Sequence, residues 1–490
     1  MQTKDRGLMR TRSRTYRLKL YDDVLAEFSL RIDEFGELSC EMLDRDESKR
    51  ALFPLAMAKG MSAESFLEWV GTRTIPKNRK FAGEILAAAG LEPDDAIGIL
   101  DACKGLSAND SYWLDNGDAD LEFGAINLFE NPLDEVLSHV AFTGCDTKQG
   151  HRAGLSAEFT TDGSYPKAWR RIDGRLVLYK AGTSGFANSG MEPYSEYFSS
   201  QIAERMGIPH VEYGLDEWKG ALASTCPLLN TKDVSYVPFF QAADPSFPNA
   251  LAVLSRLDSG MAQAYRSMLV FDAVTANVDR HGANFGVLRD NATGEVLGMA
   301  PIFDHNLALF PQEMPADFPD LLERAHGRGP VNSRLGFIDQ SGLVMGRGQH
   351  EQVARLVGFE LRNHPRYPVS EERLAALNAY LAERTRELLK IAPIDEKSLS
   401  SKMEERYRKI GEEQPIAKLS EMLEGSPAPK ADANPAHGPI SGLPPQAKRE
   451  GEPTPRGDAK RSGASIASRK GAIDSPARQK DSKTNPKKAD

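Results

Sequence analysis

Apolar and polar residues alternate along residues 15–45, which is the pattern of strands with one buried face. Tyr16, Leu18 and Leu20 carry the alternation most clearly, and the break at Phe35-Gly36 is typical of a hairpin. We therefore expect short strands at the start of the chain.

Helical spacing of apolar residues follows. The pattern predicts helices at Ala63–Val70, Arg79–Ala89 and Pro93–Lys104, the last two closed by Gly90 and Gly105. This part of the chain contains no group of residues that indicates chemistry.

From about residue 155 the pattern turns to β structure. Glu158-Phe159 leads into a turn-rich stretch at 161–166, and Trp169–Ile172 is followed by the hairpin signal Asp173-Gly174. Leu176–Lys180 is a compact apolar strand that ends in a cation. We expect three strands here, with a glycine-containing loop between the first two.

A Gly/Ser-rich loop at 182–190 comes next, and then a helix at Pro193–Met206 that Gly207 ends. The resulting order is strand, Gly-loop, strand, turn, strand with a terminal Lys, loop and helix. That order is typical of the nucleotide-binding lobe of a kinase.

The rest of the apolar pattern is mainly helical. We expect helices at Met268–Thr275, Glu351–Gly358 and Glu371–Ile391, with strands at Phe285–Leu288 and Val296–Phe303. The predicted class is therefore α+β, with a β-rich nucleotide lobe and a mainly helical C-lobe in a two-lobed, protein-kinase-like fold. The predicted parts are an accessory α/β domain at 1–150, a kinase-like domain at 151–394, a helical connector at 395–424 and a disordered basic tail at 425–490.

Charge supports this division of the 490 residues. The net charge is −9, but residues 425–490 carry 13 Lys/Arg against 7 Asp/Glu and have no Phe, Trp or Tyr. Such a tail cannot bury enough apolar area to offset the entropy of ordering it. The remaining body is acidic, which argues against a general nucleic-acid surface. There is no run of about 18 apolar residues, so we expect no membrane span and a cytoplasmic protein.

Four residues carry candidate chemistry in a workable order. Phosphoryl transfer needs a cation for the phosphates, oxygen ligands for Mg²⁺ and a carboxylate that orients the attacking hydroxyl. Lys180 ends a strand, Asp279 and Asn284 have the D-x-x-x-x-N spacing on a loop, and Asp304 ends a later strand. Each residue alone also fits a structural role, such as a turn cap or a strand end. The four together favour a kinase site.

These residues also carry a family resemblance. The motifs are Asn277-Val278-Asp279-Arg280-His281-Gly282-Ala283-Asn284, Ala300-Pro301-Ile302-Phe303-Asp304 and Thr160-Thr161-Asp162-Gly163-Ser164-Tyr165-Pro166-Lys167. They resemble the catalytic, metal-binding and nucleotide-binding segments of HipA-like bacterial Ser/Thr kinases, and the catalytic loop is similar to that of phosphatidylinositol kinases. The resemblance covers roughly residues 150–390.

The resemblance implies that Asp279 is the catalytic carboxylate and that Asn284 and Asp304 hold Mg²⁺. It implies ATP contacts for Lys180, with Glu196 as its partner, although Glu192 competes for that place. It further implies that the loop residues Gly163, Ser164 and Lys167 bind ATP. In HipA-like kinases a Ser of this loop can be autophosphorylated, which ejects the loop and switches the enzyme off, and the matching residue here is Thr160.

The expected function is ATP- and Mg²⁺-dependent transfer to a Ser or Thr of a protein whose identity the sequence does not give. A lipid or small-molecule kinase and a nucleotide-binding pseudokinase remain as alternatives. A small antitoxin-type partner also remains open, and we expect no direct contact with nucleic acid or membrane. Trp113 is a candidate contact site, but a core anchor is the better interpretation. We interpret His281 as a brace for the catalytic loop rather than as a general base.

Overall fold

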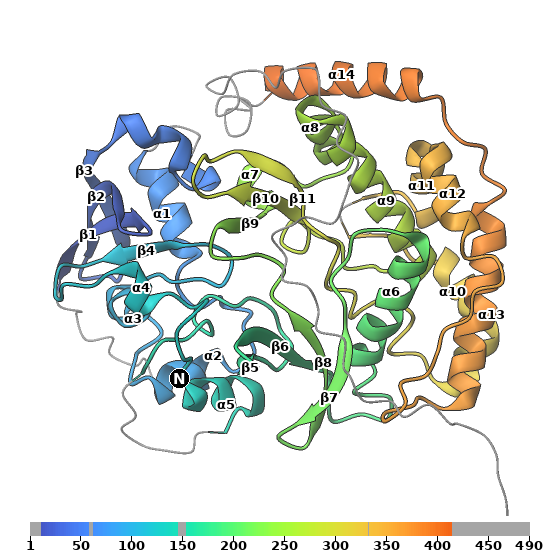
Figure 1. The fold of residues 1–490 in the computed structure, drawn as a ribbon, viewed down its shortest axis with the longest axis horizontal. Coiled ribbons are helices and arrows are strands. Elements are labelled where there is room, and N and C mark those ends of the chain that lie inside the picture. The colour runs from blue at the N-terminus through green and yellow to red at the C-terminus, as the bar shows by residue number, and fades with distance from the viewer. Residues whose placement is uncertain (1–10, 58–61, 146–152, 332, 414–490) are drawn as a thin grey trace, which may run out of the picture. The chain divides into compact units, whose positions relative to one another are not determined.

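The computed structural model describes residues 11–57, 62–145, 153–331 and 333–413 (Figure 1). The chain divides into the units Met1–Ala436 and His437–Asp490, and all described residues belong to the first. The predicted disordered tail at 425–490 and the end of the predicted connector lie outside the described residues.

The first sheet is antiparallel in the order β3-β2-β1-β4. Its strands are β1 (Arg12–Leu20), β2 (Asp23–Ile32), β3 (Leu38–Arg45) and β4 (Tyr112–Asp115). Tyr16, Leu18 and Leu20 are buried, as the alternation predicted, and Tyr16 pairs with Phe28 across the sheet. These side chains form one core with Trp69.

Helices cover this sheet and continue the accessory region. They are α1 (Ala63–Gly71), α2 (Ala82–Ala88), α3 (Ala96–Cys103), α4 (Phe123–Ile126) and α5 (Glu135–Thr143), with the short 3₁₀ turns η1 (Glu47–Leu52) and η2 (Leu55–Met57). Two predicted helices begin later than expected. Phe81 has a left-handed backbone (φ 61°), so α2 starts after it. The Asp95 carboxylate accepts from the N–H of Gly98 at 2.9 Å, and this N-cap sets the start of α3.

The second sheet has the order β5-β6-β8-β7. Its strands are β5 (Lys167–Ile172), β6 (Arg175–Ala181), β7 (Gly214–Trp218) and β8 (Ala221–Pro227), and helix α6 (Glu192–Met206) follows β6 in the chain. The β5–β6 hairpin has the predicted turn, and its register sets Lys167 opposite Lys180. The two lysines therefore stand side by side on neighbouring strands.

One predicted strand of this lobe is wrong. Glu158-Phe159 forms a turn, and the Glu158 side chain makes its contacts inside the protein. Its buried carboxylate accepts from the backbone N–H of Trp169 at 2.8 Å and pairs with Arg79 at 2.6 Å.

The third sheet has the order β11-β10-β9 and carries the segments around the candidate site. Its strands are β9 (Val234–Pro238), β10 (Gly286–Asp290) and β11 (Val296–Met299). The predicted strand Val296–Phe303 is too long, because pairing with β10 ends at Met299. Ile302 forms only an isolated bridge to His210, where the chain has moved to a different neighbour.

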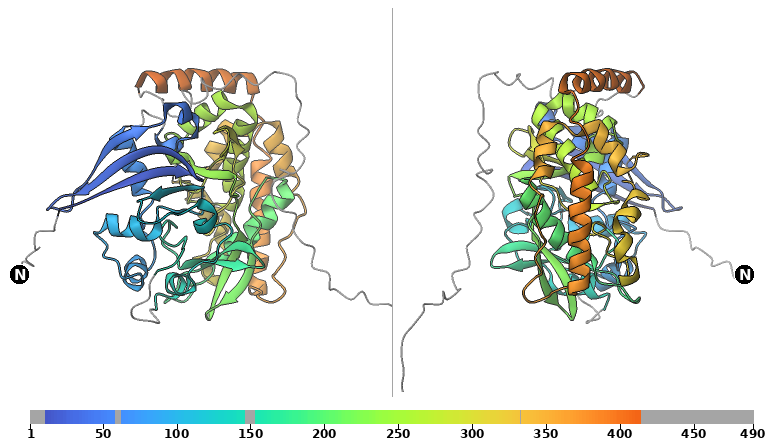
Figure 2. Two further views of the ribbon diagram at one scale, coloured as in Figure 1. Left: turned by 60° about the vertical axis from the view of Figure 1, so that its left-hand side comes forward. Right: turned by 90° about the vertical axis from the view of Figure 1, so that its right-hand side faces the viewer.

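The remaining elements are helical. They are α7 (Phe239–Ala242), α8 (Asn249–Leu257), α9 (Ser259–Thr275), η3 (Pro315–Asp320), α10 (Leu321–His326), α11 (Phe337–Val344), α12 (Arg347–Ala354), α13 (Glu371–Leu388) and α14 (Glu396–Glu413). Helix α9 lies within the largest core, and α13 packs against it (Figures 1 and 2). The helix expected at Glu351–Gly358 begins earlier, because the Gln349 side chain accepts from the N–H of Gly346 and caps the turn that starts at Arg347.

The α+β class, with a β-rich lobe followed by a mainly helical one, is confirmed. The predicted domain boundary at residue 150 stays a prediction. The described residues on both sides of it belong to one compact unit. No helix among the described residues is both long enough and apolar enough to cross a membrane.

Candidate active site

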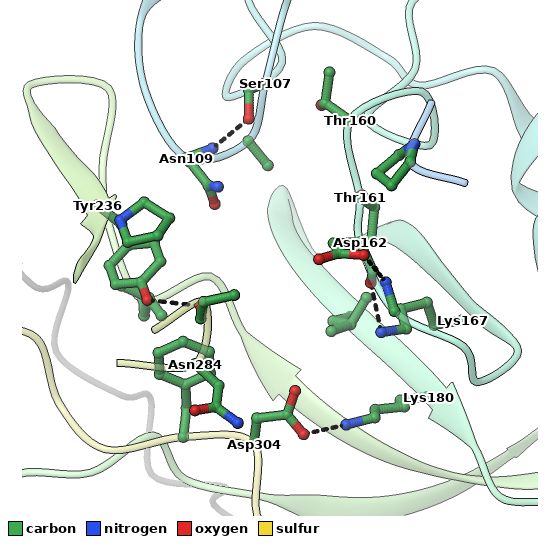
Figure 3. A pocket seen from close by; sticks show the side chains of 18 of the residues that line it. Ser107, Asn109, Thr160, Thr161, Asp162, Lys167, Lys180, Tyr236, Asn284 and Asp304 are labelled. Atoms are coloured by element: carbon green, nitrogen blue, oxygen red, sulfur yellow. Dashed lines mark hydrogen bonds and ion pairs between the residues drawn. The ribbon is translucent and has the colours of Figure 1, made fainter. Parts of the chain in front are cut away.

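A cavity of about 580 Å³ lies where segments far apart in the sequence meet (Figure 3). Residues of five regions line it: Ser107 and Asn109 of the accessory region; Thr160, Gly163, Ser164 and Lys167 of the loop before β5 and of β5; Lys180 of β6 with Glu196 of α6; Asp279, His281 and Asn284 of the loop before β10; and Asp304 after β11. The residues expected to bind ATP or Mg²⁺, to act in catalysis or to be autophosphorylated all line this cavity, whereas Glu192 and Trp113 do not.

Lys180 is buried next to the end of β6 and is held by two carboxylates. Its Nζ lies 2.9 Å from Glu196 Oε1 and 2.5 Å from Asp304 Oδ1. Burial alone would lower the pKa of Lys180, but Asp304 and Glu196 outweigh it and raise that pKa above its ordinary value. Lys180 is therefore a fixed positive charge in the cavity wall.

The two glutamates that compete for Lys180 have different partners in the structure, and only Glu196 contacts the lysine. The second oxygen of Glu196 accepts from the hydroxyl of Ser224 on β8, so this carboxylate is fixed on both sides. Burial raises the pKa of Glu196, against the opposing effect of Lys180. Glu192, one turn earlier on α6, accepts instead from the N–H of Thr183 at 3.1 Å and from its hydroxyl at 2.7 Å.

The loop between α9 and β10 is held from inside the core. Asp272 of α9 is fully buried and accepts from Arg280 Nε and Nη2, both at 2.9 Å. Its Oδ1 also accepts from the side chain of Asn277 at 3.0 Å. Arg280 then donates through Nη1 to the carbonyls of Asn284 and Phe303. One buried ion pair thus positions the loop and the segment that leads to Asp304.

Asp279 projects from this loop into the cavity with its side chain 36% exposed. Its carboxylate lies 4.0 Å from Nε2 of His281. Burial raises the pKa of Asp279, and His281 opposes that effect. His281 accepts through Nδ1 from the N–H of Ala283 at 3.2 Å, a contact within the loop that fits its interpretation as a brace.

Asn284 faces the same cavity, and its side-chain amide is oriented by the loop. Its Oδ1 accepts from the N–H of His281 at 3.0 Å, and its Nδ2 donates to the carbonyl of Asp279. An amide oxygen has two lone pairs, so Oδ1 keeps one for a further partner.

Asp304 has a left-handed backbone (φ 57°), a conformation that Asp tolerates better than most residues. Its N–H donates to the hydroxyl of Tyr213 at 3.1 Å, which fixes this turn. Burial would raise the pKa of Asp304, but Lys180 and Lys167 hold it below its usual range. The residue is therefore a carboxylate at any ordinary pH.

The oxygens of Asp304 and Asn284 suit Mg²⁺, and Asp279 lies nearby. The described residues hold no group of three or more His, Cys, Asp or Glu side chains that would form a metal site by themselves. Magnesium is usually bound by one or two carboxylates together with waters and substrate phosphates. The site therefore fits a magnesium ion that arrives with a phosphate ligand.

The loop before β5 closes over Lys167. The Lys167 Nζ donates to the carbonyl of Asp162 at 2.7 Å, and burial and then Lys180 lower the pKa of Lys167 to about 7. Gly163 has φ 105°, a backbone conformation that residues with a Cβ rarely adopt, so this position favours glycine. Ser164 is exposed at the tip of the loop.

Thr160 lies at the cavity edge, and its hydroxyl makes a hydrogen bond within the protein. It donates to the carbonyl of Leu106 at 3.1 Å, in the accessory region. This contact ties the start of the loop to the segment that carries Ser107 and Asn109 (Figure 3).

Sequence reasoning missed the part that the accessory region plays in the cavity. The carbonyl of Asn109 accepts from the N–H of Tyr236 on β9 at 2.7 Å, which brings 107–109 to the cavity. No local pattern signals a contact across more than a hundred residues. Trp113 is the predicted core anchor, since it is fully buried and its Nε1 donates to the carbonyl of Tyr21 at 2.6 Å.

Comparisons with known proteins give structural likenesses only. No protein-family model matches the chain, and no curated protein matches it. One similar solved structure is the Helicobacter pylori proinflammatory kinase CtkA, with 17% identity, a TM-score of 0.34, and coverage of 50% of this chain and 95% of that one. Another is HipA of Shewanella oneidensis MR-1 in a complex with HipB and operator DNA, with 12% identity, a TM-score of 0.47, and coverage of 80% and 99%. Both TM-scores lie below 0.5, so the function is inferred from the site geometry.

Proposed function

We propose that this chain is a kinase that transfers the γ-phosphoryl group of ATP to a Ser or Thr of a protein. The observation that carries the proposal is the Lys180 ion pair with both Glu196 and Asp304, in the cavity that Asp279 and Asn284 also line. Phosphoryl transfer needs such a set of positioned charges and little covalent chemistry from the protein.

Each side chain has a role that its surroundings favour. Lys180 would hold ATP phosphate oxygens as a fixed cation, and Lys167 would add a second contact under the loop of Gly163 and Ser164. Asp304 and Asn284 would hold Mg²⁺, which when bound neutralises charge on the phosphates. Glu196 would keep Lys180 in place. Thr160 stays the proposed position for autophosphorylation within the loop.

Asp279 would orient the acceptor hydroxyl and take its proton. The bond from the γ-phosphorus to the bridging oxygen breaks as the new bond to the hydroxyl oxygen forms, and ADP leaves. The raised pKa of Asp279, caused mainly by burial, makes this carboxylate a better proton acceptor than a solvated aspartate.

The test combines binding with transfer. Calorimetry should show ATP binding that strengthens with Mg²⁺, and labelled ATP should transfer phosphate to a protein in a bacterial lysate or to the chain itself. ATP binding with no transfer to any acceptor would favour the pseudokinase alternative. A protein that binds no nucleotide would contradict the proposal.

A further inference from the structure

A second hollow adjoins the catalytic loop at His281 and Gly282. It has a volume of about 750 Å³ and shares His281 with the nucleotide cavity. Its lining is mostly apolar and includes Pro245, Phe247, Val331, Leu335 and Leu343. We call it the acceptor groove.

Both walls of the acceptor groove contact the catalytic loop directly. A Cβ added at Gly282 would lie 2.6 Å from Cβ of Pro245, so loop and wall are in close contact. On the other wall, the N–H of Val331 donates to the carbonyl of Val278 at 2.9 Å, one residue before Asp279. A chain lying in the groove would therefore pass beside the proposed catalytic carboxylate.

The acceptor groove presents apolar side chains to solvent. Val331 is 65% exposed and Leu343 is 52% exposed. Both residues line the groove, so an occupant that covers them would remove apolar surface from water. The occupant should therefore bring apolar side chains of its own.

Helix α14 packs beside the start of α8, which follows residues of the acceptor groove. It packs against α8, and its Arg406 donates through Nε to Oδ1 of Asn249 at 2.9 Å. Asn249 begins α8, directly after the groove residues Phe247 and Pro248. The described part of α14 ends at Glu413, and 77 residues follow in the sequence.

The first stretch after Glu413 has the composition that the groove requires. Within residues 414–424 the large apolar residues are Ile416, Leu419, Met422 and Leu423. The 66 residues from 425 onward contain as many: Ile440, Leu443, Ile466 and Ile473. Ser420, the first Ser or Thr after Glu413, stands between the two apolar pairs.

The chain from Arg406 to Ser420 is comparable in length with the route along the groove to Asp279. The seven helical residues from Arg406 to Glu413, with seven further residues to Ser420 at full stretch, could span up to about 34 Å. The route along the groove wall has four residue steps from Asn249 to Pro245 and three from Gly282 to Asp279, and side-chain contacts join Arg406 to Asn249 and Pro245 to Gly282.

We propose that residues 414–424 bind in the acceptor groove and present Ser420 to Asp279 as a phosphoacceptor of the same molecule. This inference rests on the proposed kinase function. The Ser420 hydroxyl oxygen attacks the γ-phosphorus of ATP, its proton passes to the Asp279 carboxylate, and ADP leaves. The product is one phosphoserine for each ATP consumed.

The experiment uses the full chain with ATP and Mg²⁺, with phosphosites read by mass spectrometry and ADP measured in the same samples. We expect phosphate on Ser420 at a rate per molecule that does not change over a hundredfold dilution. Ser420→Ala should remove that site, and Asp279→Ala should leave Ser420 unmodified. A rate that rises with protein concentration would overturn transfer within one molecule and indicate a second copy as acceptor.

A matched pair of variants tests the acceptor groove. Leu343→Asp places a charge in the groove, and Val357→Asp does the same at a 62% exposed valine outside it. Leu343→Asp should slow Ser420 labelling at least about tenfold, because a charge cannot replace an apolar contact, whereas Val357→Asp should not. Equal rates in the two variants would overturn the groove as the docking site.

The same samples separate this inference from the kinase proposal. ADP formation with phosphate on other residues or on an added lysate protein, and none on Ser420, would overturn the tail inference and leave the kinase function standing. Neither ADP formation nor ATP binding in the wild-type chain would overturn both.

Discussion

At the scale of single residues, the neighbours of the two lysines in the site set the charge of each one. Lys180 lies between two carboxylates and stays charged, whereas Lys167 donates to a carbonyl and lies close to that charge. The same residue type on neighbouring strands therefore has opposite pKa shifts. The surroundings of each lysine lead to a prediction that substitution of a neighbour or of the lysine can test.

Glu196 and Glu192 provide a matched pair of substitutions, because both are buried on α6 and only Glu196 contacts Lys180. Glu196→Gln should lower phosphoryl transfer by about 100-fold, since the cation loses a partner that positions it. Glu192→Gln should have an effect of less than about tenfold. Transfer rates at saturating ATP check this, and equal losses in the two variants would contradict the role of Glu196.

The lowered pKa of Lys167 predicts a proton linked to nucleotide binding. With a pKa of about 7 instead of 10.5, the amine is mostly neutral at pH 8 before ATP binds. A triphosphate beside it favours the charged form, so binding at pH 8 should take up roughly one proton, and less at pH 6, where Lys167 is already charged.

Calorimetry in two buffers of different ionisation enthalpy measures this uptake. Lys167→Met should bind ATP more weakly and without the additional proton. An unchanged proton uptake at pH 8 in that variant would show that another group titrates.

At the scale of elements, the buried Asp272 joins helix α9 to the loop between α9 and β10 through its bonds to Arg280. Asp272→Asn leaves Arg280 buried with no full negative charge and should lower the free energy of unfolding by about 3–5 kcal/mol. Asp23, 66% exposed and 2.9 Å from Lys49, is the control. Asp23→Asn should cost less than about 1 kcal/mol. Urea unfolding measures both, and a similar small loss at Asp272 would contradict this account of the loop.

Elements with a local signal were predictable from the sequence. The Asp173-Gly174 turn and the alternation at Tyr16, Leu18 and Leu20 depend on neighbours within a few residues, and the structure has both. The D-x-x-x-x-N spacing of Asp279 and Asn284 is likewise local, and the structure brings them to one cavity.

Elements that depend on distant partners were not predictable. Glu158 turns inward because Arg79, far away in the sequence, lies there to pair with it. The strand before Asp304 is short because Ile302 pairs with His210 instead of continuing beside β10. The place of Asn109 at the cavity depends on its bond to Tyr236. Apolar periodicity contains no information about such contacts.

At the scale of the whole molecule, the accessory region shares its interior with the rest of the chain. Arg289 of β10 is buried and donates through Nη1 to the carbonyl of Phe53 at 3.0 Å and to the hydroxyl of Tyr112 at 2.8 Å. Trp113 and Trp169 belong to one apolar cluster. Residues before 151 therefore complete the core of those after it.

A chain that begins at residue 151 should for this reason fail to fold. We expect no cooperative thermal transition and no ATP binding, because Arg289 and the apolar cluster lose their partners. A cooperative melt with ATP stabilisation would show that the predicted boundary at 150 separates independent domains.

Removal of residues 425–490 should have the opposite outcome. This segment has no aromatic residues, so we expect the melting temperature and the ATP affinity to stay unchanged. A thermal melt of the truncated chain checks this, and a loss of several degrees would contradict it.

The central claim is that Asp279 and Asp304 serve one phosphoryl transfer in different ways. The measurement that tests it most directly is ATP affinity with and without Mg²⁺, taken beside phosphate transfer, in Asp279→Ala and Asp304→Ala. Asp279→Ala should bind ATP with Mg²⁺ as the wild type does and lose transfer by at least about 1000-fold, because only positioning of the hydroxyl is lost. Asp304→Ala should lose the gain in ATP affinity that Mg²⁺ gives, because a metal ligand is gone. Full transfer by Asp279→Ala, or the same Mg²⁺ dependence in both variants, would contradict the account.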